Sequence, residues 1–66
     1  MDLEYLKYKI RSQKMNNSQF AKKIGISKSG FYKKMRGDTE WTCEEMKKIK
    51  ETLGLSLEEL NKIFGF

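Results

Sequence analysis

The sequence predicts an all-α fold, in which the 66 residues form one compact domain of five short helices. Three observations support this prediction. Apolar residues recur three and four positions apart, as they do on the buried face of a helix. Capping residues and glycines alternate along the chain, as expected for repeated helix starts and ends. The sequence contains no proline, which would interrupt a helix.

The first helix is expected over residues 3–14. Leu3, Leu6 and Ile10 have the spacing of one buried helix face. Asp2 precedes this helix and can cap its first turn.

The four later helices are expected over residues 17–24, 28–36, 43–53 and 57–64. Each follows a capping residue that has an apolar residue before it and another four positions after it, the hydrophobic staple. These capping residues are Asn16, Ser27, Thr42 and Ser56. Glycines that can adopt the left-handed helix-ending conformation are Gly25, Gly37 and Gly54.

The apolar faces of the five helices predict the core. Its expected members are Leu3, Leu6, Ile10, Met15, Phe20, Ala21, Ile24, Ile26, Phe31, Met35, Met46, Ile49, Leu53, Leu55, Leu60 and Ile63.

The composition excludes several classes of protein. Without histidine, the chain has no Ser–His or Cys–His nucleophile pair and lacks the common zinc ligand sets. We therefore expect no enzymatic activity, cofactor or metal. Cys43 is the only cysteine, which fits a reducing cytoplasm and favours an inert side chain over a redox switch. No signal peptide and no apolar run long enough to cross a bilayer are found.

Charge is divided unevenly along the chain. Residues 1–36 hold ten lysines and arginines against two acids, whereas residues 37–66 hold four against seven. This asymmetry favours a surface for a polyanion in the first half. An ordinary solvated surface is the alternative interpretation.

Residues 25–27 form a three-residue connection containing glycine, which is typical of a helix-turn-helix. On the helix that follows, five polar residues fall within an arc of about 140°, opposite Phe31 and Met35. They are Lys28, Ser29, Tyr32, Lys33 and Arg36. The arc carries no acid, and such side chains bind base edges and phosphates in a major groove. A solvated basic face is again the alternative.

The segment from Asn17 to Gly37 resembles the helix-turn-helix of the phage lambda repressor/Cro family, and residues 53–60 resemble the start of that family's fifth helix. Residues 30–34 and the pair Ile63 and Phe64 resemble small Cro-like regulators of phages that infect Gram-positive bacteria. The resemblance implies a transcriptional regulator, expected to be a repressor, that binds a double-stranded DNA operator in the bacterial cytoplasm or nucleoid. A protein-interaction or antirepressor module with the same fold is the alternative.

The resemblance also implies roles for individual residues. Lys28, Ser29 and Lys33 occupy the family's base-reading positions, and Tyr32 lies beside them. Asn17 stands where the family usually has a glutamine that binds phosphate. The expected phosphate-binding residues are Asn16, Asn17, Ser18, Lys34, Arg36, Thr39 and Thr42. We expect Lys34 to extend along the edge of the core toward a phosphate.

Two features depart from the wider family or need an explanation. Ile10 and Met35 replace a buried arginine and glutamate of many relatives, which predicts an apolar contact between them. Gly30 lies inside the third helix, at a cost of about 1 kcal/mol relative to alanine. It allows either close packing of the second helix or local adaptability.

The C-terminal residues include more large apolar side chains than a five-helix core easily holds. Leu57, Phe64 and Phe66 are therefore candidates for a weak homodimer interface. Burial of Phe64 in the core is the alternative.

Overall fold

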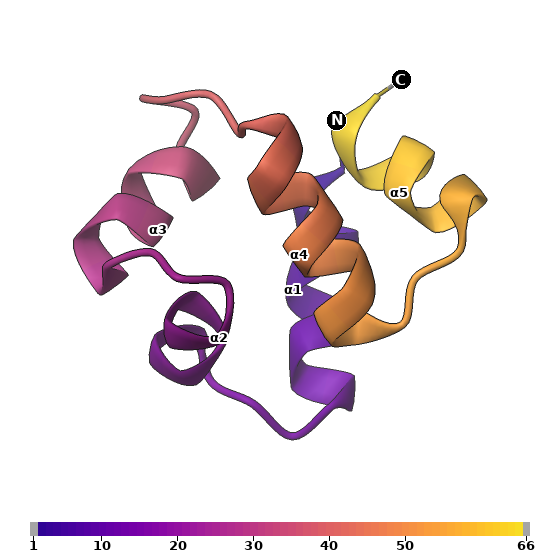
Figure 1. Cartoon of the computed structure of the whole chain (residues 1–66), viewed down its shortest axis with the longest axis horizontal. Coiled ribbons are helices and arrows are strands. Elements are labelled where there is room, and N and C mark those ends of the chain that lie inside the picture. The colour runs from indigo at the N-terminus through magenta and orange to yellow at the C-terminus, as the bar shows by residue number, and fades with distance from the viewer. Residues whose placement is uncertain (1, 66) are drawn as a thin grey trace.

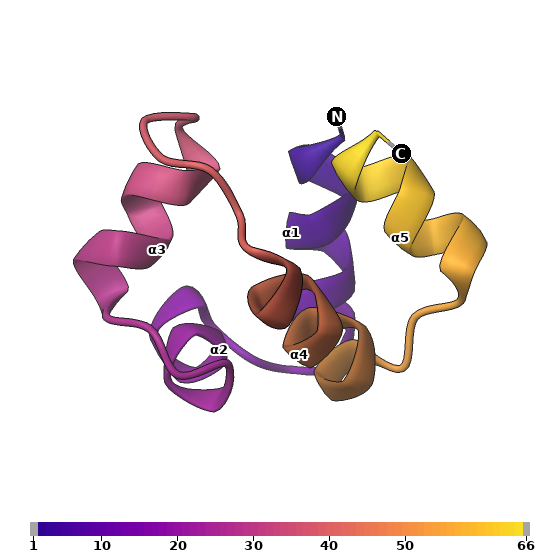
Figure 2. The same cartoon turned by 45° about the horizontal axis from the view of Figure 1, so that its top comes forward.

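The structure is a computed structural model that describes residues 2–65. Its helices are α1 (Leu3–Ser12), α2 (Asn17–Lys23), α3 (Lys28–Met35), α4 (Cys43–Leu53) and α5 (Leu57–Phe64). Residues 2–65 contain no strand, so the all-α prediction is confirmed. In both views, α3 and α5 lie on opposite sides of the molecule, with α1 and α4 between them (Figures 1 and 2).

All five helices begin at the predicted capping residues. The capping side chain in each case accepts a hydrogen bond from the backbone N–H three positions later. Three of these starts are complete capping boxes, because a Gln or Glu side chain also accepts from the cap's own N–H. These pairs are Asn16 with Gln19, Thr42 with Glu45 and Ser56 with Glu59.

The first helix ends two residues earlier than expected, at Ser12. Lys14 adopts a left-handed φ of 60°, and the N–H of Met15 reaches back to the carbonyl of Ile10 at 3.3 Å. This bond closes the helix in the way that usually requires glycine. No sequence pattern indicated this ending, because lysine rarely adopts that conformation.

The predicted core is confirmed, since all sixteen expected residues are buried or pack against the buried cluster. Met35 packs against the cluster that contains Ile10, and the direct contact between these two residues stays a prediction. Trp41 and Phe64 are also buried. No helix within residues 2–65 is long and apolar enough to span a membrane.

Aromatic rings link the helix-turn-helix to the C-terminal helix. Phe31 on α3 meets the ring of Phe20 on α2 at 5.9 Å and that of Trp41 at 6.1 Å, both edge to face. Trp41 in turn meets Phe64 on α5 at 5.7 Å. The exposed position expected for Phe64 in a dimer interface is therefore corrected, because its ring is part of the core. Leu57 is exposed, and Phe66 lies outside the described residues.

Polar contacts hold α5 against α1. The hydroxyl of Tyr5 donates to Glu59 at 2.7 Å, and the ammonium of Lys9 lies 3.2 Å from the same carboxylate oxygen. At the end of α5, the carbonyl of Ile63 accepts from the N–H of Asp2 at 2.8 Å. The two ends of the described chain are thus joined by backbone and side-chain bonds.

Candidate nucleic-acid interface

In the turn between α2 and α3, a backbone hydrogen bond closes the end of α2 and a side chain then caps the start of α3. Gly25 has a φ of 79°, which an L side chain rarely adopts. The N–H of Ile26 donates to the carbonyl of Ala21 at 3.0 Å, which closes α2. Ser27 then caps α3 by accepting from the N–H of Gly30 at 3.0 Å. This short turn fixes α3 against α2, and α3 lies at one side of the molecule (Figure 1).

The five polar residues predicted to share one arc of α3 are all exposed, whereas Phe31 is fully buried beneath them. The exposed residues are Lys28, Ser29, Tyr32, Lys33 and Arg36. The ammonium of Lys28 lies 6.0 Å from the centre of the Tyr32 ring. This acid-free surface, which we call the α3 face, presents cations, a hydroxyl and a phenol on a rigid helix.

Gly30 does not make room for α2. A Cβ at this position would lie 3.0 Å from the hydroxyl oxygen of Ser27 and would meet no atom of α2 within 4 Å. The proposed close packing of the second helix is therefore wrong. The contact that a larger side chain would disturb is the cap of α3 itself.

The expected phosphate-binding residues at the start of α2 differ in exposure and in their hydrogen-bond partners. Asn16 is exposed, and its side-chain carbonyl is occupied by the N–H of Gln19 at 2.8 Å. Its amide N–H groups can still donate to an anion. Ser18 is exposed and Asn17 is half-buried.

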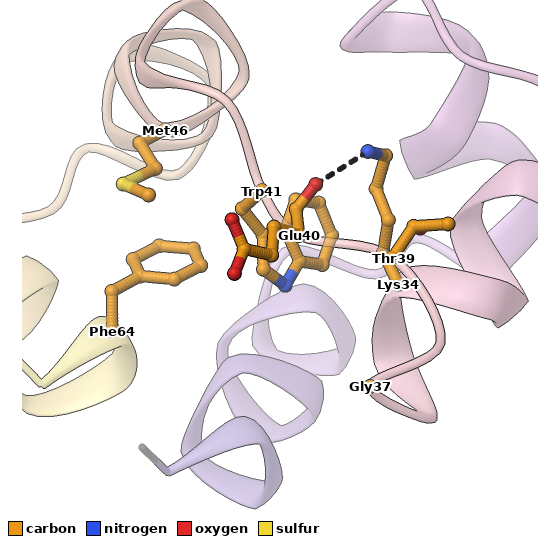
Figure 3. A pocket seen from close by; sticks show the side chains of 7 residues that line it. All are labelled: Lys34, Gly37, Thr39, Glu40, Trp41, Met46 and Phe64. Carbon is orange, nitrogen blue, oxygen red and sulfur yellow. Dashed lines mark hydrogen bonds between the residues drawn. The ribbon is translucent and has the colours of Figure 1, made fainter.

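Lys34 does not fit the expected role of a phosphate-binding residue. Its ammonium donates to the carbonyl of Glu40 at 2.8 Å (Figure 3). The same ammonium lies 3.1 Å from the carboxylate of Glu45. It also lies 5.8 Å from the centre of the Trp41 ring. Only 14% of the Lys34 side chain is exposed. The side chain follows the edge of the core as expected, but it ends on partners within the protein.

Glu45 completes this arrangement from the start of α4. Burial disfavours its charged form, but hydrogen bonds from the Thr42 backbone and from Lys34 outweigh burial and hold the pKa of Glu45 below its ordinary value. Glu45 therefore carries its negative charge at neutral pH, beside the ammonium of Lys34. Together they fasten the end of α3 to the start of α4 across the intervening loop.

By their place in the sequence, Glu45 lies three residues after the Thr42 cap and Trp41 lies directly before it, so both belong to the start of α4. Trp41 forms one wall of a hollow of about 380 Å³, where Figure 3 shows it between Lys34 on one side and Phe64 with Met46 on the other. No local pattern could reveal their longer-range contacts. Glu45 pairs with Lys34 on α3, and Trp41 packs against Phe31 on α3 and Phe64 on α5.

The remaining expected phosphate-binding residues lie on the exposed surface. The guanidinium of Arg36 pairs with Asp38 at 2.7 Å, and both side chains are more than half exposed. Thr39 and Thr42 are exposed, and the Thr42 hydroxyl accepts from the N–H of Glu45.

Comparison with protein families identifies a match over residues 6–64 to the model described as the Cro/C1-type HTH DNA-binding domain. Searches of curated proteins and of solved structures found no significant match. The family match covers most of α1 and all of the other four helices, including the α3 face and the turn that holds it. The chain therefore belongs to the Cro/C1-type helix-turn-helix family of DNA-binding domains.

Proposed function

We propose that this DNA-binding regulator is a Cro-like repressor of a phage of Gram-positive bacteria, which acts in the host cytoplasm. It occupies an operator in double-stranded DNA with α3 in the major groove. The α3 face carries the proposal, because an exposed helix surface with three cations and no acid suits a groove lined by phosphates and base acceptors. Repression follows when the operator overlaps a promoter.

Within this proposal, the residues of the α3 face have different tasks. Base edges are read by the four residues of the α3 face that lie in the first two turns of the helix, namely Lys28, Ser29, Tyr32 and Lys33. Phosphates are bound at the edges of the interface. The residues proposed for that task are Asn16, Asn17, Ser18, Arg36, Thr39 and Thr42.

The test begins with selection of bound sequences from a random duplex pool, followed by titration of the selected duplex at several salt concentrations. Counterion release gives a slope of log affinity against log salt of about −0.9 for each phosphate contacted. Salt-independent binding, or no enrichment of duplexes, would overturn the proposal and favour a protein-interaction or antirepressor module.

Two substitutions separate reading from phosphate binding. Lys33→Ala should cost about 1–3 kcal/mol at one base pair and relax preference there. Arg36→Ala should weaken all duplexes alike, since phosphates carry no direct sequence information. Equal effects of both variants on every sequence would argue against a reading role for Lys33.

We also propose a weak homodimer on DNA, since relatives in this fold bind paired half-sites about 34 Å apart. Of the described residues expected at the dimer interface, Phe64 is buried. Leu57 is 67% exposed and remains the candidate contact. Selected operators with two-fold symmetry would support the dimer. A single asymmetric site bound by one protein copy would contradict it.

A further inference from the structure

A hollow of about 250 Å³ opens between α1, the start of α2 and the side of α3. Its lining consists of Lys7, Arg11, Asn17, Tyr32, Met35 and Arg36. Three of these six side chains are cationic and none is acidic. Because Tyr32 and Arg36 also belong to the α3 face, the hollow is continuous with the surface proposed to contact DNA.

The three cations differ in their partners. Lys7 lies 3.2 Å from Glu4, and Arg36 lies 2.7 Å from Asp38, so carboxylates outside the lining partly balance both. Arg11 is exposed, and its guanidinium has no hydrogen-bond or ion-pair partner within residues 2–65. Its five N–H donors are therefore available to a ligand.

Arg11 lies close to a second cation of α1. Lys7 and Arg11 are four residues apart on one helix, a spacing at which like charges repel each other. An anion held between them would remove this repulsion. Guanidinium, amide and phenol donors beside one another suit a compact oxyanion with several acceptor oxygens, which is the chemistry of a phosphate.

We propose that this hollow binds one phosphate of the DNA backbone and that Arg11 is its principal ligand. Lys7 raises the local positive potential, while the Asn17 amide and the Tyr32 hydroxyl supply further donors. The inference rests on the proposed function, because the phosphate belongs to the duplex that α3 reads. It adds α1 to an interface that the sequence assigned to α2, α3 and the following loop.

The proposed site adds a phosphate contact to an interface in which two of the expected phosphate-binding residues are weak. The Asn17 amide is short and uncharged, and Lys34 is occupied by Glu40 and Glu45. Arg11 has a longer reach than Asn17 and a permanent charge. The sequence of α1 indicates only a core face, and only the folded chain brings Arg11 beside Asn17 and Tyr32.

Arg11→Gln tests the site, with Lys47→Gln as the matched control. Lys47 is exposed on α4, lies outside the hollow and carries the same charge. For the selected duplex, Arg11→Gln should reduce the steepness of the salt dependence by about 0.9 and weaken binding about tenfold. The preference among base sequences should stay as in the wild type. Lys47→Gln should keep the wild-type salt dependence.

A second measurement locates the phosphate. Each phosphate of the selected duplex is replaced in turn by an uncharged methylphosphonate. One replacement should weaken the wild-type protein but not Arg11→Gln, because the variant has already lost that contact. Thermal unfolding of both variants verifies that they are folded.

The outcomes distinguish the two proposals. Wild-type salt dependence in Arg11→Gln, or the same response of both proteins to every methylphosphonate, would overturn the site while leaving DNA binding intact. If the wild-type protein itself shows no salt-dependent duplex binding, the proposed function fails and the site fails with it.

Discussion

At the scale of single residues, the partners of a lysine decide its role. Lys33 and Lys34 are neighbours in α3, but Lys33 lies on the exposed face and Lys34 ends on Glu40 and Glu45. Successive residues on a helix point about 100° apart, so one position separates a solvent-facing cation from one at the core edge. The same residue type therefore has two different environments within one helical turn.

Replacing Lys34 should affect stability more than phosphate binding. Lys34→Gln leaves the half-buried Glu45 carboxylate without its cation, and we expect a loss of about 1–2 kcal/mol of unfolding free energy. The salt dependence of DNA binding should remain that of the wild type. Urea unfolding and salt titration measure the two effects, with Lys47→Gln as the control for one lost charge. Unchanged stability with a shallower salt dependence would instead identify Lys34 as a phosphate ligand.

At the scale of elements, α5 depends on Glu59 for its place on α1. The backbone N–H of Ser56, the hydroxyl of Tyr5 and the ammonium of Lys9 all stabilise the charged carboxylate and lower the pKa of Glu59 from 4.5 to about 2. One side chain thus caps α5 at its start and also joins it to α1.

This lowered pKa makes the stability of the protein dependent on pH. Because the folded state holds Glu59 ionised at pH values where the unfolded chain protonates it, the stabilisation is present above about pH 5 and is lost between about pH 5 and 2. Glu59→Gln should be less stable than the wild type at pH 7 and should lose less stability on acidification. Urea unfolding across this range measures the difference.

Glu58→Gln provides the matched control, since Glu58 is the neighbouring carboxylate and is exposed. It should follow the wild-type pH dependence. Parallel curves for Glu59→Gln and the wild type would show that Glu59 does not stabilise the packing of α5.

At the scale of the whole molecule, a row of four aromatic rings connects the helix-turn-helix to α5. These are Phe20, Phe31, Trp41 and Phe64. The loop between α3 and α4 is held in place by contacts among Lys34, Glu45 and Trp41 and by the bond from Lys34 to Glu40. The α3 face is therefore supported from beneath by the core and from one end by the start of α4.

Truncating Phe64 tests this connection. Phe64→Ala should lower the free energy of unfolding by about 3 kcal/mol, because it leaves a cavity beside Trp41. Leu57→Ala, on the exposed side of the same helix, should change it by less than about 0.5 kcal/mol. Chemical unfolding of both variants at low protein concentration makes the comparison. Similar, small losses for both would place Phe64 outside the core.

Local chemistry was sufficient to predict the helices and most of the core. The caps at Asn16, Ser27, Thr42 and Ser56 depend on hydrogen bonds over three residues, so the sequence pattern contains them completely. The exposed arc of α3 follows from helical periodicity alone. The end of α1 could not be predicted, because the left-handed conformation of Lys14 reflects the path that the chain takes into α2.

The sequence by itself therefore determined five helices, their buried faces and the acid-free surface of α3, because each depends on spacing within one helix or turn. Only the tertiary structure decided that Lys34 pairs with Glu45, that Phe64 is buried on Trp41, and that Arg11 lies beside Asn17 and Tyr32. Those contacts join residues from different elements. Their distances depend on how the helices pack, which no local pattern specifies.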